Sequence, residues 1–107
     1  MFARVTTYEL PLGGASEAVE SFQPAIERIR ELDGLVEAFF LVERDGSHAI
    51  SLTLWESLDA MERSRVAASR ARIDAAGLIE AEVVSTHELE VGIRSAARPV
   101  VDAASAS

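Results

Sequence analysis

Two apolar segments, residues 35–44 and 47–55, are separated by only Asp45 and Gly46. Both segments are rich in β-branched, aromatic and aliphatic side chains, which favour strands, and Asp-Gly is a preferred sequence for a two-residue type I′ turn. This pattern predicts a β-hairpin. The hairpin constrains the fold more than any other feature of the chain, because both of its faces are largely apolar.

The register of this hairpin follows from placing Arg44 opposite Ser47, since side chains then alternate between two defined faces. One face carries Leu35, Phe39, Leu41, Ile50, Leu52 and Leu54, and the other carries Val36, Phe40, Val42, Ala49, Ser51, Thr53 and Trp55. A sheet that is apolar on both sides must be covered on both sides. Helices can cover one side here, and we expect a second copy of the chain to cover the other.

The segments before the hairpin predict a strand and a helix. Residues 2–10 are rich in β-branched and aromatic side chains, which favours a first strand. Apolar residues then recur at spacings of three and four until Gly34, which predicts an amphipathic helix. Its apolar stripe is Val19, Phe22, Ile26, Ile29 and Leu32. Pro24 leaves two alternatives, a helix that kinks there or one that begins at Ser21, and we expect the kink.

The segments after the hairpin predict a second helix and a last strand. Ser57 is a good N-cap, and alanine-rich sequence continues from it to Gly77. The apolar side of this helix is expected to hold Leu58, Met61, Ala68 and Ile73, and the solvated side Glu62, Arg63, Arg65, Arg70 and Arg72. Residues 80–91 alternate strongly, which predicts a half-buried strand. Its apolar side holds Val83, Ser85, His87, Leu89 and Val91, and its solvated side holds Glu82, Thr86, Glu88 and Glu90.

The order β-α-β-β-α-β predicts an α+β, ferredoxin-like fold, with a four-stranded antiparallel sheet and two helices on one face. We expect residues 1–92 to form this domain and residues 93–107 to be a tail, mobile or docked on a partner subunit through Val100 and Val101. A length of 107 residues suits one domain.

Composition excludes several classes of function. The net charge of -8 disfavours binding to nucleic acid, and no apolar run is long enough to cross a membrane. The chain has no cysteine and no lysine, which excludes thiolate chemistry and lysine Schiff bases. His48 and His87 lack companion ligands, so we expect no metal site. We expect a cytoplasmic protein, since the N-terminus has no signal-peptide pattern.

The segment Leu54-Trp55-Glu56-Ser57-Leu58-Asp59-Ala60, in which a tryptophan ends a strand and a Ser-capped helix follows at once, resembles the antibiotic biosynthesis monooxygenase domain family. The resemblance extends over residues 2–92. It implies a homodimeric α/β barrel, in which two sheets pack face to face. It also implies a small aromatic ligand and cofactor-free oxygenation of a phenol or quinol, although the same fold carries other activities.

The resemblance is incomplete at positions that carry the family's chemistry. Many members have a histidine early in the second helix, where this chain has Met61-Glu62-Arg63-Ser64-Arg65. Members that degrade haem have an asparagine, a tryptophan and a histidine where this chain has Thr6 or Thr7, about Ser64, and residues 74–76. These departures disfavour haem degradation, and we expect no cofactor.

Oxygenation without a cofactor needs a base, an oxyanion partner and a dry aromatic pocket. His87 is the candidate base, because imidazole exchanges protons near neutral pH, and the competing interpretation is a hydrogen-bonded core histidine. Tyr8 or Arg4 would orient the oxyanion, although a salt bridge is the common fate of such an arginine. The candidate substrate-binding residues are Trp55, Phe40 and Met61, and for Trp55 simple packing is the alternative.

Two further functions remain open at this stage. One is a non-catalytic homodimer that binds a small hydrophobic molecule or has a structural role, which the missing helical histidine favours. The other is an isomerase or cyclase that uses the same cavity. A cavity lined by His87 would favour an enzyme, and a core filled by side chains would favour the non-catalytic protein.

Overall fold

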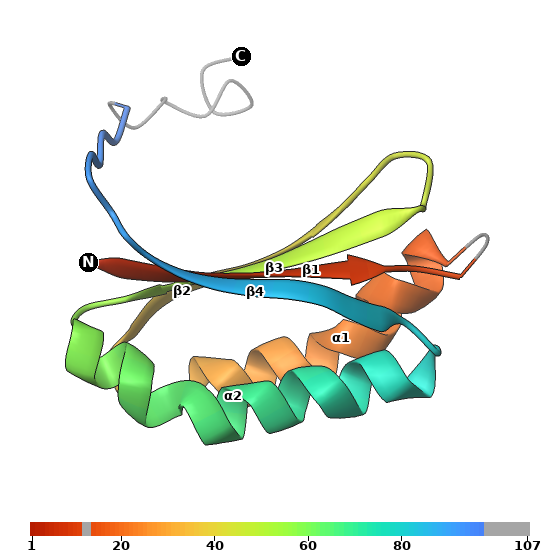
Figure 1. The fold of residues 1–107 in the computed structure, drawn as a ribbon, viewed down its shortest axis with the longest axis horizontal. Coiled ribbons are helices and arrows are strands. Elements are labelled where there is room, and N and C mark those ends of the chain that lie inside the picture. The colour runs from red at the N-terminus through yellow and green to blue at the C-terminus, as the bar shows by residue number, and fades with distance from the viewer. Residues whose placement is uncertain (12–13, 98–107) are drawn as a thin grey trace, which may run out of the picture.

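The computed structural model describes residues 1–11 and 14–97. Its elements are β1 (Phe2–Glu9), α1 (Ala15–Arg30), β2 (Leu35–Val42), β3 (His48–Trp55), α2 (Leu58–Leu78) and β4 (Glu82–Glu90). The strands form one antiparallel sheet in the order β2-β3-β1-β4, and both helices lie on the same face of it (Figure 1). The predicted ferredoxin-like βαββαβ fold is therefore confirmed.

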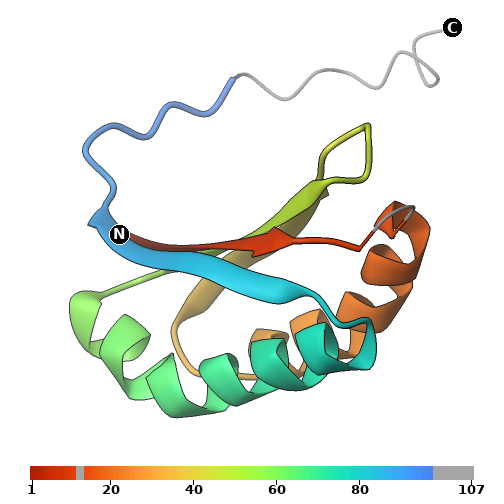
Figure 2. The same ribbon diagram turned by 45° about the vertical axis from the view of Figure 1, so that its right-hand side comes forward.

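The turned view in Figure 2 shows the two helices together beneath the sheet, and it shows residues 91–97 leaving β4 on the opposite side. Val100 and Val101, which were expected to dock on a partner, lie outside the described residues.

The register of the hairpin is confirmed, but its turn is not the predicted one. Leu41 pairs with Ile50 and Phe39 with Leu52, as placing Arg44 opposite Ser47 requires. A type I′ turn needs a positive φ at both central residues, and of the Asp45-Gly46 pair only Gly46 has one, at 77°. Instead, the Gly46 amide donates to the Glu43 carbonyl, and the Asp45 carboxylate accepts from Ser47.

The start of the hairpin, at Leu35 and Val36, differs from the prediction. The register of β2 against β3 shifts between Leu35 and Glu37, so that Leu35 pairs with Trp55. A bulge of this kind moves the residues beyond it to the opposite face. Leu35 consequently packs against the buried core under the helices, and Val36 is exposed.

Helix α1 begins at Ala15, so the alternative start at Ser21 is wrong, and Pro24 lies inside the helix. Pro24 is on the exposed side, where water can satisfy the carbonyl that loses its amide partner. The buried stripe consists of Ala18, Phe22, Ala25 and Ile29. Val19, which the sequence placed on this stripe, is exposed.

Helix α2 begins as predicted, with the Ser57 hydroxyl accepting a hydrogen bond of 3.1 Å from the Ala60 amide. Gly34, at φ 83°, lies against this helix start, and a Cβ atom there would be 2.4 Å from the Ala60 Cβ. No other residue type fits that position without moving α2. Strand β2 and the first turn of α2 are thereby held close together.

The buried side of α2 differs from the prediction in a way that matters for the site. Leu58 and Ile73 are exposed, and Arg72, expected on the solvated side, is buried. The buried residues are Ala60, Met61, Ser64, Ala68, Ala71, Arg72, Ala75 and Ala76. Alanine provides little contrast in hydropathy along the helix, so the predicted faces depended on its larger apolar and charged residues.

The two faces of the sheet differ in how many polar side chains they carry. The face under the helices carries buried polar side chains, among them Arg4, Thr6, Ser51 and Thr53. The open face carries aliphatic and aromatic side chains of the hairpin, β1 and β4, whereas Tyr8, Phe40 and Trp55 lie on the covered face. Members of the open face include Val5, Phe39, Leu41, Ile50, Leu52, Leu54 and Leu89. An apolar face without a cover is therefore present, as the sequence predicted.

Candidate functional site

Arg4, in the middle of β1, is the centre of a hydrogen-bond network beneath α2. Its side chain is only 2 % exposed. The guanidinium donates from Nε and Nη2 to the Glu88 carboxylate at 3.0 and 2.7 Å, from Nη1 to the Ser64 hydroxyl at 3.1 Å, and from Nη2 to the Met61 carbonyl at 2.8 Å. A buried charge requires this degree of pairing. We call Arg4, Ser64, Arg65 and Glu88 the Arg4 network.

Glu88 joins the network to the surface of α2. Its carboxylate accepts from Arg4 and also from Arg65, whose Nε lies 3.1 Å from Oε1. The hydrogen bonds from Arg65, together with those from Arg4, lower the pKa of Glu88 from 4.5 to about 2. Glu88 therefore remains ionised at neutral pH. The sequence placed this residue on a solvated strand face, whereas it lies on the face under the helices.

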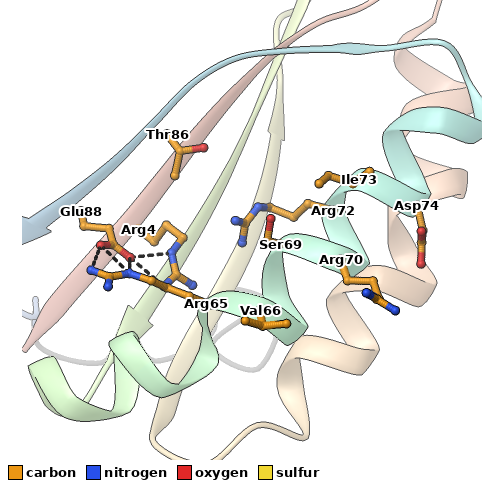
Figure 3. A pocket seen from close by; sticks show the side chains of 10 residues that line it. All are labelled: Arg4, Arg65, Val66, Ser69, Arg70, Arg72, Ile73, Asp74, Thr86 and Glu88. Atoms are coloured by element: carbon orange, nitrogen blue, oxygen red, sulfur yellow. Dashed lines mark hydrogen bonds and ion pairs between the residues drawn. The ribbon is translucent and has the colours of Figure 1, made fainter.

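A cleft of about 980 Å³ opens beside this network, between α2 and strands β1 and β4. It is lined by Arg4, Arg65, Val66, Ser69, Arg70, Arg72, Ile73, Asp74, Thr86 and Glu88 (Figure 3). Four arginines thus meet two carboxylates, in a chain whose net charge is -8. The cleft combines cations, two hydroxyl groups and two aliphatic side chains, a lining suited to a small organic molecule with negative charge. We call it the α2 cleft.

Arg72 differs from the other arginines of the α2 cleft. It is 7 % exposed, and its guanidinium makes no hydrogen bond or ion pair within the part of the chain that the structure describes. Figure 3 shows it reaching from α2 toward the side of the cleft where Arg4 and Thr86 lie, while Arg70 points away. Burial lowers the pKa of Arg72, but arginine stays charged at neutral pH.

Tyr8 lies on the same face of β1 but in a different environment, under α1. Its ring contacts Phe22 edge to face at 4.8 Å, and Phe22 stacks on Phe40 at 4.3 Å. The Tyr8 hydroxyl shares a 2.9 Å hydrogen bond with Ser51, and burial raises the pKa of Tyr8. We call Tyr8, Phe22 and Phe40 the aromatic cluster. It is packed core and does not line the α2 cleft.

The structure divides the predicted site residues among three places, namely the surroundings of the α2 cleft, the aromatic cluster and the open face of the sheet. Arg4 lies at the α2 cleft, with its guanidinium carbon 5.7 Å from the Trp55 ring centroid and in contact with the Met61 carbonyl. Trp55 and Met61 are buried behind it, and the Trp55 indole donates to Thr53. Tyr8 and Phe40 belong to the aromatic cluster.

His87 lies apart from both the α2 cleft and the aromatic cluster. It pairs with Val5 on the open face of the sheet and is exposed, because the apolar side of β4 faces away from the helices. His87 does not line the α2 cleft. The sequence revealed which residues of β4 share a face, but not which of the two faces the helices cover.

Sequence reasoning missed Arg72 and Glu88 as residues of the site. A signal for Arg72 was present, because it lies four residues after Ala68 and four before Ala76, on one side of a helix. For Glu88, the signal was its position opposite Arg4 in neighbouring strands, which becomes visible only when the pairing of β1 with β4 is known.

The described residues contain neither a metal-binding cluster nor a membrane-spanning helix. No three histidine or acidic side chains there are grouped so that they could hold a metal ion. No helix among residues 1–11 and 14–97 has the length and hydropathy needed to cross a bilayer.

Comparison of the sequence with known proteins gives only partial matches. No family model matches the chain. The uncharacterized protein Rv2557 of Mycobacterium tuberculosis, and MT2634 from a second strain, are 33% identical to it over 63 residues. These residues are 58% of this chain but only 28% of the relatives' length, so the chain spans about a quarter of the proteins it matches.

Comparison of the structure identifies the fold. A protein of Deinococcus radiodurans assigned to the antibiotic biosynthesis monooxygenases has a TM-score of 0.73 at 17% identity, with 92% of this chain and 99% of that chain covered. The haem-degrader MhuD of Mycobacterium tuberculosis gives 0.71 at 19%, covering 90% and 100%. SnoaB, a cofactor-independent oxygenase of Streptomyces nogalater, gives 0.70 at 16%, covering 87% and 94%. The chain thus has the fold of the antibiotic biosynthesis monooxygenase proteins, as the resemblance predicted.

Proposed function

We propose that this protein binds a small aromatic molecule in the α2 cleft and acts on it as a cofactor-independent, monooxygenase-like enzyme with a phenol or quinol substrate. The α2 cleft carries the proposal, because it is large enough for such a molecule and is lined by four arginines. The fold shared with a cofactor-independent oxygenase supports it further.

The cationic lining supplies one requirement of this chemistry. A phenol or quinol reacts with O₂ after it has lost a proton, and nearby positive charge favours the ionised form. In the overall reaction, one oxygen atom enters the substrate and the other leaves as water, with electrons and hydrogens supplied by the substrate. Val66 and Ile73 provide apolar contact for the ring.

A second candidate function is ligand binding without catalysis. Two observations favour it. Among the described residues, no histidine lines the α2 cleft. Both carboxylates of the lining are already paired, Glu88 with Arg4 and Arg65, and Asp74 with Arg28. A base for removing the substrate's proton is therefore not evident among the residues that line the cleft. His87 does not line this cleft and has no role in either proposed function.

Oxygen consumption with hydroquinone and anthrone tests the catalytic proposal. We expect uptake well above the spontaneous rate, abolished by Ser69→Trp, which fills the α2 cleft. Ala67→Trp is the matched control, because Ala67 is exposed on the same helix and outside the lining. Binding of these probes without oxygen uptake would support the non-catalytic function, and uptake that Ser69→Trp leaves unchanged would contradict the site.

We also propose that two copies pack through the open face of the sheet. This face exposes large apolar side chains, among them Leu41 at 48 % and Leu89 at 52 %. An uncovered apolar sheet of this extent marks an interface.

Sedimentation at micromolar concentration should give a dimer, and the double variant Leu41→Glu, Leu52→Glu should give a folded monomer. Val66→Glu, on the exposed side of α2, should remain dimeric, and a monomeric wild-type protein would refute the proposal.

A further inference from the structure

Arg72 is a charged residue that is largely buried, and burial of its charge costs free energy. A guanidinium that is removed from water without a partner loses solvation that nothing in the protein replaces. Among residues 1–11 and 14–97, every other buried polar side chain on the covered face has a partner, including Arg4, Thr6, Tyr8 and Trp55. The described residues contain no fully buried side-chain nitrogen or oxygen without a partner, so the Arg72 nitrogens still reach the space of the α2 cleft.

The groups around Arg72 leave its charge unopposed. Arg4 and Arg65 share the single carboxylate of Glu88, so two positive charges already face its one negative charge. Asp74, at the other end of the lining, forms its ion pair with Arg28 of α1 and points away from Arg72 (Figure 3). The position beside Arg72 is consequently the one in the α2 cleft that most favours an anion.

We infer that Arg72 binds the carboxylate of an organic ligand in the α2 cleft, with the ring or chain of that ligand lying against Val66 and Ile73. The planar guanidinium presents paired N–H donors that match the two oxygens of a carboxylate. The Ser69 and Thr86 hydroxyls in the same lining can donate to such a group. The volume of about 980 Å³ suits an organic anion better than an inorganic ion.

This inference rests on the ligand cleft of the proposed function and narrows its ligand class to carboxylates. It also has a consequence for the protein without ligand. If Arg72 is retained for binding, replacing it by an apolar residue of similar length removes an unfavourable buried charge. Arg72→Met should then raise the melting temperature of the unliganded protein by a few degrees.

Titration with benzoate, benzamide and phenyl phosphate tests the inference, with binding followed through the arginine Nε–Hε resonances of the full chain. We expect benzoate to shift the Arg72 resonance saturably and to bind about tenfold more tightly than benzamide. Arg72→Met should remove this preference. Arg63→Gln, which removes the same charge from an exposed ion pair on α2, should keep it.

Three results would overturn the inference. Benzoate without saturable binding, or with the same affinity in Arg72→Met, would show that Arg72 holds no carboxylate. Phenyl phosphate binding more tightly than benzoate would assign the position to phosphate esters. A melting temperature that falls in Arg72→Met would show a structural role. Benzoate binding without any oxygen uptake would retain the inference while refuting the oxygenase, so the two failures are distinguishable.

Discussion

The two helices cover the same face of the sheet in different ways. Under α1, the aromatic cluster of Tyr8, Phe22 and Phe40 fills the space between helix and strands. Under α2, the corresponding space holds the Arg4 network, a cleft, and Arg72, which has no hydrogen-bond or ion-pair partner among the described residues. The α1 half is closely packed, whereas the α2 half contains buried charge and open volume. Substitutions in the two halves should therefore have different consequences.

The largest effect is expected from the aromatic cluster. Phe22→Ala removes a fully buried ring from the α1 half and should lower the free energy of unfolding by about 3–5 kcal/mol, measured by urea denaturation. Phe22→Leu fills most of the volume and should cost about 1 kcal/mol, which provides a folded variant for comparison. Val66→Ala, at an exposed position of α2, should change stability by less than about 0.5 kcal/mol. Equal losses at Phe22 and Val66 would contradict the difference between the halves.

A smaller effect is expected in the Arg4 network. Glu88→Gln leaves the buried Arg4 guanidinium without its charge partner and should lower the free energy of unfolding by about 2 kcal/mol at neutral pH. Asp59→Asn breaks the exposed ion pair with Arg63 and should cost less than about 0.5 kcal/mol. If Glu88→Gln is as mild as Asp59→Asn, the network contributes little to the position of α2.

The same carboxylate should give the stability a defined dependence on pH. The pKa of Glu88 is lowered in the folded protein, from 4.5 to about 2, so its ionised form stabilises the fold. This contribution is present above pH 4.5 and is lost as the pH falls through about 2. Unfolding curves of the wild type and Glu88→Gln should therefore converge in acid. A difference that stays constant from pH 7 to pH 2 would exclude this origin.

The smallest effect is expected from the hydrogen bond between Tyr8 and Ser51. Tyr8→Phe keeps the ring contacts of the aromatic cluster but leaves the buried Ser51 hydroxyl without its partner, which should cost about 1 kcal/mol. The double variant Tyr8→Phe, Ser51→Ala should recover part of this loss. A double variant that is less stable than Tyr8→Phe would show that Ser51 has a further role.

The fold was predictable because its signals are local. Alternation in the hairpin, the Ser57 cap and the spacing around Phe22 depend on neighbours a few residues apart, and the hairpin register followed from them. The bulge at Leu35 was not predictable, since it depends on how β2 meets the start of α2.

The candidate site was less predictable, because it depends on contacts between distant segments. Arg4 and Glu88 are 84 residues apart and meet only through the pairing of β1 with β4. Arg72 was assigned to solvent because a charged residue on an alanine-rich helix usually lies there. His87 became a candidate base through the assumption that the apolar side of β4 faces the helices, and the sheet has the opposite orientation.

The hydrogen bond of 2.9 Å from the Ser21 hydroxyl to the Ala75 carbonyl links α1 to the last turns of α2. The first turns of α2 are attached to the sheet through Met61 and Ser64, whereas its far end is supported by α1. The width of the α2 cleft therefore depends partly on α1, although α1 contributes no described residue to its lining. A substitution at Ser21 can therefore change the shape of the α2 cleft without altering any residue that lines it.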